Sequence, residues 1–281
     1  MVRAASHWTE QDQNNRMWAP QPWVLEIPIL KRLVPSLLRR YAGIAKHPFV
    51  IERRMGALFV IDQRNLVDKM LLVRGNWEWR QIETLQLLAT QAAERLPGRR
   101  RIFLDIGAHG GLYAILAAQA GGCDELHAFE PEPENFAQLQ ANLFVNGLVG
   151  TITAHQAAVS AAKGELRIVS APRFNRAAAA IATPGIDSGP HRTHAVPCIA
   201  LDATIVAQGA LLVAKIDVET HELEVIEGMR GLLAANDAVL QIECFEPNRP
   251  RLRAMMDQLG YREVKIIDED LYFVAKTPGL A

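Results

Sequence analysis

Cysteine is scarce in this chain, and the residues present are not spaced as metal ligands. The 281 residues include three cysteines, Cys123, Cys198 and Cys244, which is an odd number without ligand spacing. The pattern argues against a disulfide framework and favours a reducing compartment. We therefore expect a cytoplasmic protein.

Long apolar runs and an excess of one charge are also missing. No uninterrupted apolar stretch approaches the roughly 18–20 residues of a membrane-spanning helix, and the amino terminus lacks the basic-then-apolar order of a secretory signal. Lys and Arg number 30 against 31 Asp and Glu, for a formal net charge of −1. Such a balance gives no overall attraction to nucleic acid or acidic membranes. We expect a soluble globular protein with no nucleic-acid partner and no membrane span, in which a peripheral membrane contact would need a local patch.

The amino-terminal part differs from the rest. Residues 1–22 lack periodicity and are expected to form a loose arm. Residues 23–46 interleave leucine with basic residues, but Pro28 and Pro35 interrupt them, which predicts a broken amphipathic helix. We expect it to cap the main domain, with a peripheral membrane or partner contact as the alternative. The predicted division is an arm and cap at 1–54 and a catalytic domain at 55–281.

Strands and helices alternate beyond residue 55. A strand at Ala57–Ile61 and a helix at Trp77–Ala93 come first. Further strands are predicted at 101–106, 125–130, 151–158, 211–217 and 238–243, and helices at 111–120, 133–146, 221–235 and 249–259. This alternation implies parallel strands with right-handed crossovers, while 263–267 and 271–275 indicate an antiparallel hairpin. The fold class is α/β: a doubly wound, Rossmann-like sheet, mostly parallel, with a C-terminal antiparallel hairpin.

A glycine-rich turn, Leu104-Asp-Ile-Gly-Ala-His-Gly-Gly111, joins a predicted strand to its helix. Glycines let the chain turn sharply and let its backbone approach a ligand. A dinucleotide fingerprint would have glycine where Asp105 stands. A carboxylate there suits a cationic ligand group instead. We assign ligand binding to Asp105, Gly107, His109 and Gly111.

An acidic residue ends the next predicted strand. Glu130, followed by Pro131, lies roughly 20 residues beyond the turn, where a carboxylate can accept the hydrogen bonds of both ribose hydroxyls. Because the turn and this acid lie on consecutive strand ends, the pair predicts a nucleoside ligand rather than a merely structural turn.

Several motifs together resemble those of the FkbM-type methyltransferases. They are Asp105-Ile-Gly-Ala through Gly111-Leu-Tyr113, Ala128-Phe-Glu-Pro-Glu-Pro-Glu-Asn-Phe136, Leu139, Asn142, Asn146-Gly-Leu148, Ala157-Ala-Val-Ser160 with Gly164, Leu201-Asp202, and Lys215-Ile-Asp-Val-Glu219. The resemblance covers about residues 55–275, including Gly75-Asn-Trp-Glu78. It implies the methyltransferase variant of the sheet, S-adenosylmethionine as donor, and O-methylation of sugars, polyketides or lipid-linked glycans. It also places Gln156 and Ala157 by the adenine and Asp217 near the methionine end.

The chain departs from the family pattern at two places. His109-Gly110 stands where the family usually has Asn and an aliphatic residue, and Thr220-His221 stands where the family usually has Gly after the Asp-x-Glu motif. The second departure lies near the expected acceptor site.

Candidates for the chemistry follow from the expected reaction. Methyl transfer needs alignment of the acceptor, and an alkyl hydroxyl needs a base or a metal. Because ligands bind at the carboxyl ends of parallel strands, we assign catalytic roles to Asp217, Glu219, His221 and Glu243. Glu219 alternatively favours a helix start. A divalent metal on Asp217, Glu219 and Glu243 is compatible with the residues but is not demanded by their spacing.

Residues 171–196 lack clear periodicity and include Arg173 and Arg176. We expect a lid over a hydroxylated small-molecule or glycan-like acceptor, with a solvated loop as the alternative. The predicted function is an S-adenosylmethionine-dependent O-methyltransferase acting on a sugar, glycan or secondary metabolite. The alternatives are an RNA or protein methyltransferase and a non-catalytic nucleoside-binding module docking to a membrane or partner.

Overall fold

The computed structural model describes residues 48–170, 180–181 and 192–275. The predicted arm and almost all of the predicted cap lie outside these residues, as does most of the predicted lid, including Arg173 and Arg176. The chain divides into two compact units between Trp77 and Glu78, and each is described by itself.

A hairpin and one helix make up the described part of the first unit. Strands β1 (Phe49–Arg54) and β2 (Ala57–Asp62) pair antiparallel and precede helix α3 (Leu66–Arg74). The side chain of Asn65 accepts the Val67 N–H and caps α3. The hairpin straddles the domain boundary expected after residue 54, and that boundary stays a prediction.

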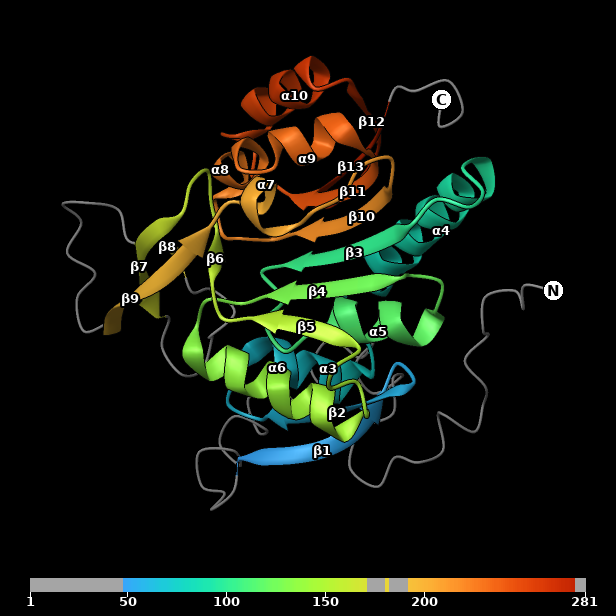
Figure 1. Cartoon of the computed structure of the whole chain (residues 1–281). Coiled ribbons are helices and arrows are strands. Elements are labelled where there is room, and N and C mark those ends of the chain that lie inside the picture. The colour runs from blue at the N-terminus through green and yellow to red at the C-terminus, as the bar shows by residue number, and fades with distance from the viewer. Residues whose placement is uncertain (1–47, 171–179, 182–191, 276–281) are drawn as a thin grey trace. The chain divides into compact units, whose positions relative to one another are not determined.

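The second unit contains a seven-stranded sheet in the order β12-β13-β11-β10-β3-β4-β5. Five strands run parallel, and β13 is antiparallel to both of its neighbours. This confirms the predicted fold class. The strands are β3 (Arg101–Ile106), β4 (Glu125–Phe129), β5 (Ile152–His155), β10 (Leu211–Ile216), β11 (Asp237–Glu243), β12 (Tyr261–Ile267) and β13 (Asp270–Ala275). Figure 1 shows β10 beside β3, although they are far apart in sequence. Since β3 pairs with β4 on one side and with β10 on the other, the strand order reverses there, and a ligand crevice is expected at its carboxyl end.

Helices cover this sheet. They are α4 (Trp79–Arg95), α5 (Leu112–Ala120), α6 (Pro133–Val145), α7 (Leu201–Thr204), α8 (Glu222–Glu227), α9 (Arg230–Ala235) and α10 (Arg249–Gln258). Helix α4 packs on β10 and β11, whereas α5 packs on β3, β4 and β5. The helix predicted at 221–235 is two helices, α8 and α9, which meet at Gly228. Among the described helices, none has the length and apolarity needed to cross a bilayer.

A second sheet lies between β5 and β10 in sequence, in the order β6-β9-β7-β8. Its strands are β6 (Ala158–Val159), β7 (Gly164–Ser170), β8 (Ala180–Ile181) and β9 (Arg192–Ile199). The single strand predicted at 151–158 is therefore wrong: it splits after His155, because Ala158 and Val159 pair with β9 instead. Residues 192–196 of the predicted lid belong to β9, where buried Val196 and Cys198 alternate with exposed Ala195 and Pro197.

Substitution of Gly228 tests the packing of α8 against the second sheet. A Cβ at Gly228 would lie 2.0 Å from the carbonyl oxygen of Ser160, a backbone atom that follows β6. We expect Gly228→Ala to lower the free energy of unfolding by about 3 kcal/mol, the upper end of the overpacking range, as measured by urea denaturation. Gly164→Ala is the control, because its Cβ would lie 3.6 Å from Cys198 Sγ. Equal stabilities of the two variants would contradict this packing.

Candidate functional site

The glycine turn after β3 needs glycine at two positions. Gly107 has φ 80°, and a Cβ there would lie 1.7 Å from the carbonyl oxygen of Asp217. Gly111 has φ 82°, and its Cβ would lie 2.4 Å from Leu139 Cδ1 in α6. The turn is thereby pressed against the end of β10 on one side and against α6 on the other.

One carboxylate oxygen of Asp105 is a hydrogen-bond acceptor without a donor among the described residues. Its side chain is 1% exposed, and its Oδ2 accepts the Ala114 N–H at 2.9 Å. Its Oδ1 is buried and makes no hydrogen bond. Burial raises the pKa of Asp105 to about 6, with the Lys215 charge acting in the opposite direction. Because a buried acceptor without a donor costs about 1–3 kcal/mol, this atom fits a ligand that brings a donor.

Glu130 ties the turn to the start of α6. Its Oε2 accepts the His109 N–H and its Oε1 accepts the Glu132 N–H, each at 2.8 Å. Burial raises its pKa to about 7, although both N–H groups favour the ionised form. The Asn135 side chain is a third hydrogen-bond donor to this carboxylate, so about one of its four acceptor positions is left for the predicted contact with a ribose hydroxyl.

The remaining predicted donor residues lie at the same edge of the sheet. Pro131 is half-buried directly after Glu130, while exposed Gln156 and buried Ala157 follow β5. Their contact with an adenine stays a prediction.

A row of polar residues crosses the middle of the sheet. Register places Lys215 of β10 beside Asp105 on one side and beside Gln241 on the other, and Gln241 pairs with Tyr272. All four side chains are at most 6% exposed. The Lys215 ammonium lies 5.1 Å from the ring centroid of Tyr113 in α5. Central strands of a parallel sheet are normally apolar on both faces, so this row indicates function.

Lys215 and Asp217 form a buried ion pair. The Lys215 ammonium donates to Asp217 Oδ2 at 2.8 Å. Burial works to lower the pKa of Lys215, but the carboxylates of Asp217, Asp105 and Glu78 outweigh it and hold the pKa above its usual value. Burial likewise works to raise the pKa of Asp217, but Lys215 holds it below its usual value. Both groups are therefore charged at neutral pH.

Glu243, the last residue of β11, hydrogen-bonds to Asp217. Burial, followed by the Asp217 charge, raises the pKa of Glu243 well above its usual value. Glu243 thus carries the proton of this bond at neutral pH and donates it to Asp217.

Two consecutive left-handed residues precede α8. Glu219 has φ 51° and Thr220 has φ 80°, a conformation that is strained for a β-branched side chain. Burial and then the Asp217 charge raise the pKa of Glu219, which is half-buried, to about 7. The carboxylate that accepts the Thr220 N–H is that of Glu222, at 2.8 Å.

His221 makes its contacts elsewhere. Its Nε2 lies 3.0 Å from Ser160 Oγ, and its Nδ1 lies 3.5 Å from a carboxylate oxygen of Glu224. Burial lowers its pKa. These contacts join α8 to the second sheet, and the catalytic role of His221 stays a prediction.

Sequence reasoning missed a buried hydrogen-bonded chain beside the row. The Tyr113 hydroxyl donates to Glu78 Oε2 and accepts from Gln241 Nε2, each at 2.9 Å. Gln241 Nε2 also donates to Asp270 Oδ1 at 2.8 Å. Burial raises the pKa of Asp270 to about 7. The available signal was Gln241 itself, a polar residue inside an otherwise apolar strand.

The ionisable side chains of the described residues do not form a metal centre. Within the part of the chain that the structure describes, no group of three or more His, Cys, Asp or Glu side chains is placed to hold a metal ion. Asp217, Glu219 and Glu243 are all described residues, so the structure does not bring these three carboxylates together as the divalent-metal site considered from the sequence.

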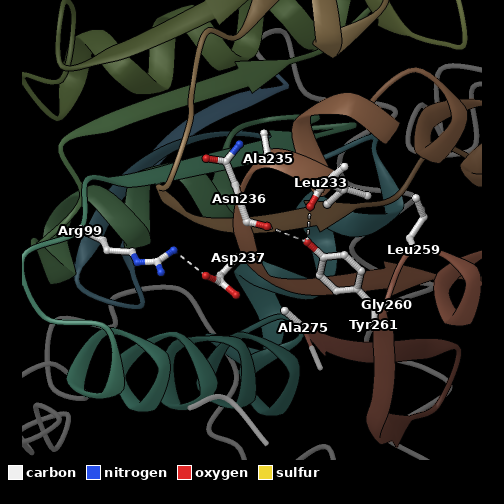
Figure 2. Close-up of a pocket in the computed structure, with 10 residues that line it drawn as sticks. Arg99, Leu233, Ala235, Asn236, Asp237, Leu259, Gly260, Tyr261 and Ala275 are labelled. Atoms are coloured by element: carbon white, nitrogen blue, oxygen red, sulfur yellow. Dashed lines mark hydrogen bonds and ion pairs between the residues drawn. The ribbon is translucent and has the colours of Figure 1, made fainter. Parts of the chain in front are cut away.

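A separate hollow of about 250 Å³ lies where β11 begins, at the opposite edge of the sheet (Figure 2). Arg99 pairs with Asp237 there, and the Tyr261 hydroxyl donates to the carbonyl oxygens of Leu233 and Asn236. Its lining residues lie at the opposite ends of the strands from Asp217 and Glu243, so the hollow does not belong to the candidate site.

The strain at Thr220 predicts a stabilising substitution. We expect Thr220→Gly to raise the free energy of unfolding by about 1 kcal/mol, because glycine adopts a positive φ without the cost that a β-branched residue bears there. Thr153→Gly, on exposed extended backbone in β5, is the control and should be destabilising by about 0.5–1 kcal/mol. Thermal denaturation measures both, and a loss of stability in Thr220→Gly would contradict the strain.

Comparison with known proteins identifies the family. No curated protein matches the sequence. Among solved structures, the human methyltransferase 10 domain containing protein shares 13% identity over 88% of this chain and 95% of that chain, with a TM-score of 0.45. M. jannaschii TYW2 in complex with AdoMet shares 13% over 82% and 85%, with a TM-score of 0.41. At these TM-scores the similarities carry no argument about function. The family model of the methyltransferase FkbM domain, by contrast, matches residues 105–263, more than half of the chain. The predicted resemblance is confirmed, and the chain belongs to the FkbM methyltransferase domain family.

Proposed function

We propose that the protein transfers a methyl group from S-adenosylmethionine to a hydroxyl oxygen of a sugar, glycan or secondary-metabolite acceptor. The observation that carries the proposal is the meeting of two features at one edge of the sheet. The glycine turn, which carries the unpartnered Asp105 Oδ1, lies against the backbone of Asp217. The side chain of Asp217 is paired with Lys215 and hydrogen-bonded to Glu243.

The donor side of the site fits this cofactor. When bound, S-adenosylmethionine supplies a methyl group made electrophilic by its sulfonium. Asp105 would accept hydrogen bonds from its ammonium group, and Glu130 would accept them from the ribose hydroxyls. The family resemblance assigns the adenine to Gln156 and Ala157. The unsatisfied buried Oδ1 of Asp105 is the independent support for this assignment.

On the acceptor side, Glu219 has the pKa best suited to a general base among the four predicted catalytic residues. A carboxylate with a pKa of about 7 is substantially ionised at neutral pH, yet it still binds a proton well. Asp217 is a weaker base, because Lys215 stabilises its ionised form. We assign Glu219 to take the acceptor hydroxyl proton, and we assign Asp217, held by Lys215 and by protonated Glu243, to orient that hydroxyl.

The competing interpretation is a nucleoside-binding module without turnover. Calorimetric titration with S-adenosylmethionine, followed by incubation with a panel of hydroxylated sugars and glycans and mass spectrometry of the products, separates the two. A methylated hydroxyl product supports the proposal. Donor binding without any product would favour the module, and absence of donor binding would overturn the proposal.

Substitution of the base is expected to change both rate and pH dependence. Because Glu219 must be ionised to accept a proton, kcat/KM should rise with pH through about 7 in the wild type. In Glu219→Gln we expect a loss of about 10²–10⁴-fold and no such rise. Glu165→Gln, on exposed backbone of β7, is the control. A retained pH profile in Glu219→Gln would assign the base elsewhere.

The proposed role of Asp105 predicts a separate effect on the binding of the donor. Asp105→Asn keeps an oxygen for the Ala114 N–H but removes the charge, so we expect its dissociation constant for S-adenosylmethionine to rise by about 10- to 100-fold. Isothermal titration calorimetry measures this, with Asp257→Asn on the exposed face of α10 as the control. Unchanged affinity would contradict the donor assignment.

A further inference from the structure

Glu78 begins helix α4 in a conformation that the helix itself does not favour. It is the N-cap residue, with φ 49° and ψ 30°, and its side chain makes no capping hydrogen bond. An acidic N-cap side chain normally accepts a helix N–H and thereby stabilises the helix. A left-handed backbone conformation is also strained for a residue other than glycine. Something other than helix formation therefore accounts for the position of this carboxylate.

The Glu78 carboxylate is bound to α5, the helix that follows the glycine turn. It accepts the hydroxyl of Tyr113, which is 6% exposed and is the second residue of α5, directly after Gly111 and Leu112. Gln241 of β11 donates to the same hydroxyl, and this fixes the Tyr113 oxygen between β11 and the start of α4. The carboxylate is thus placed by a chain of fully buried groups.

Glu78 lies within electrostatic reach of three buried ionisable groups. Its charge acts on Asp105, Lys215 and Asp270. Lys215 is already paired with Asp217, while Asp105 Oδ1 has no donor. The unsatisfied oxygen of Asp105 and the charge of Glu78 that acts on it together favour a further cation beside Asp105.

We propose that Glu78 is a donor-binding residue that holds the α-ammonium of the methionine moiety of S-adenosylmethionine together with Asp105, and that Tyr113 positions its carboxylate. The ammonium is the fitting group, because it carries three N–H donors for carboxylate acceptors, whereas the sulfonium carries none. This inference rests on the proposed function.

Three ligands distinguish binding of the ammonium group from binding of the rest of the donor. S-adenosylmethionine has both cationic groups, S-adenosylhomocysteine keeps only the ammonium, and 5′-methylthioadenosine has neither. In Glu78→Gln we expect the dissociation constants of the first two to rise by about 10- to 100-fold and that of the third to change by less than about twofold. Calorimetric titration of the full chain measures all three.

The matched control is Glu83→Gln, which removes the same charge from an exposed position of the same helix and should leave all three constants unchanged. Tyr113→Phe keeps the Glu78 charge but removes its hydrogen bond, so a smaller loss is expected for the two amino-acid-bearing ligands alone. If Glu78→Gln does not fold, Tyr113→Phe decides the question by the same comparison.

Other outcomes overturn the inference. An equal loss for all three ligands would show a structural role, and a loss confined to S-adenosylmethionine would show a contact with the sulfonium instead. Unchanged affinities would show no contact. A wild-type chain that binds none of the ligands would overturn the proposed function itself.

Discussion

The buried ion pair between Lys215 and Asp217 is the interaction on which the rest of the site depends. Burying two charges is costly, and in many proteins an apolar pair of the same volume would be at least as stable. Here the pair influences the protonation of its neighbours. Burial raises the pKa of Glu243 and of Glu219, and Asp217, which Lys215 keeps ionised, raises both further. Burial and the charges of this pair together give carboxylates of the same type different protonation states.

Close packing connects this pair to the glycine turn. Gly107 lies so near the carbonyl oxygen of Asp217 that no side chain fits between them, and the register of β3 with β10 sets Asp105 beside Lys215. The turn assigned to the donor and the carboxylates assigned to the acceptor therefore share one rigid support. Such preorganisation is what the alignment of two reactants demands.

Residues with a strained backbone conformation lie at the same edge of the sheet. His109, Glu219 and Thr220 all have positive φ without being glycine, and His109 and Thr220 are also where the chain departs from the family pattern it otherwise resembles. Thr220 replaces the small flexible residue expected after the Asp-x-Glu motif and brings a side chain to the exposed rim. The acceptor preferences of this chain are therefore expected to differ from those of relatives with glycine there.

Sequence alone determined the alternating strands and helices, the C-terminal hairpin and the residues at the strand ends, such as Asp105, Glu130, Asp217 and Glu243. These follow from local periodicity and from the rule that parallel strands end at one edge. Only the tertiary structure decided that Glu78 reaches Tyr113, that Gln241 stands beside Lys215, and that residues 158–159 leave the main sheet for β9. It also decided which carboxylates hold protons. Register and burial join residues far apart in the chain, and a pKa depends on the charges and solvent around a group, so neither can be read from neighbours in sequence.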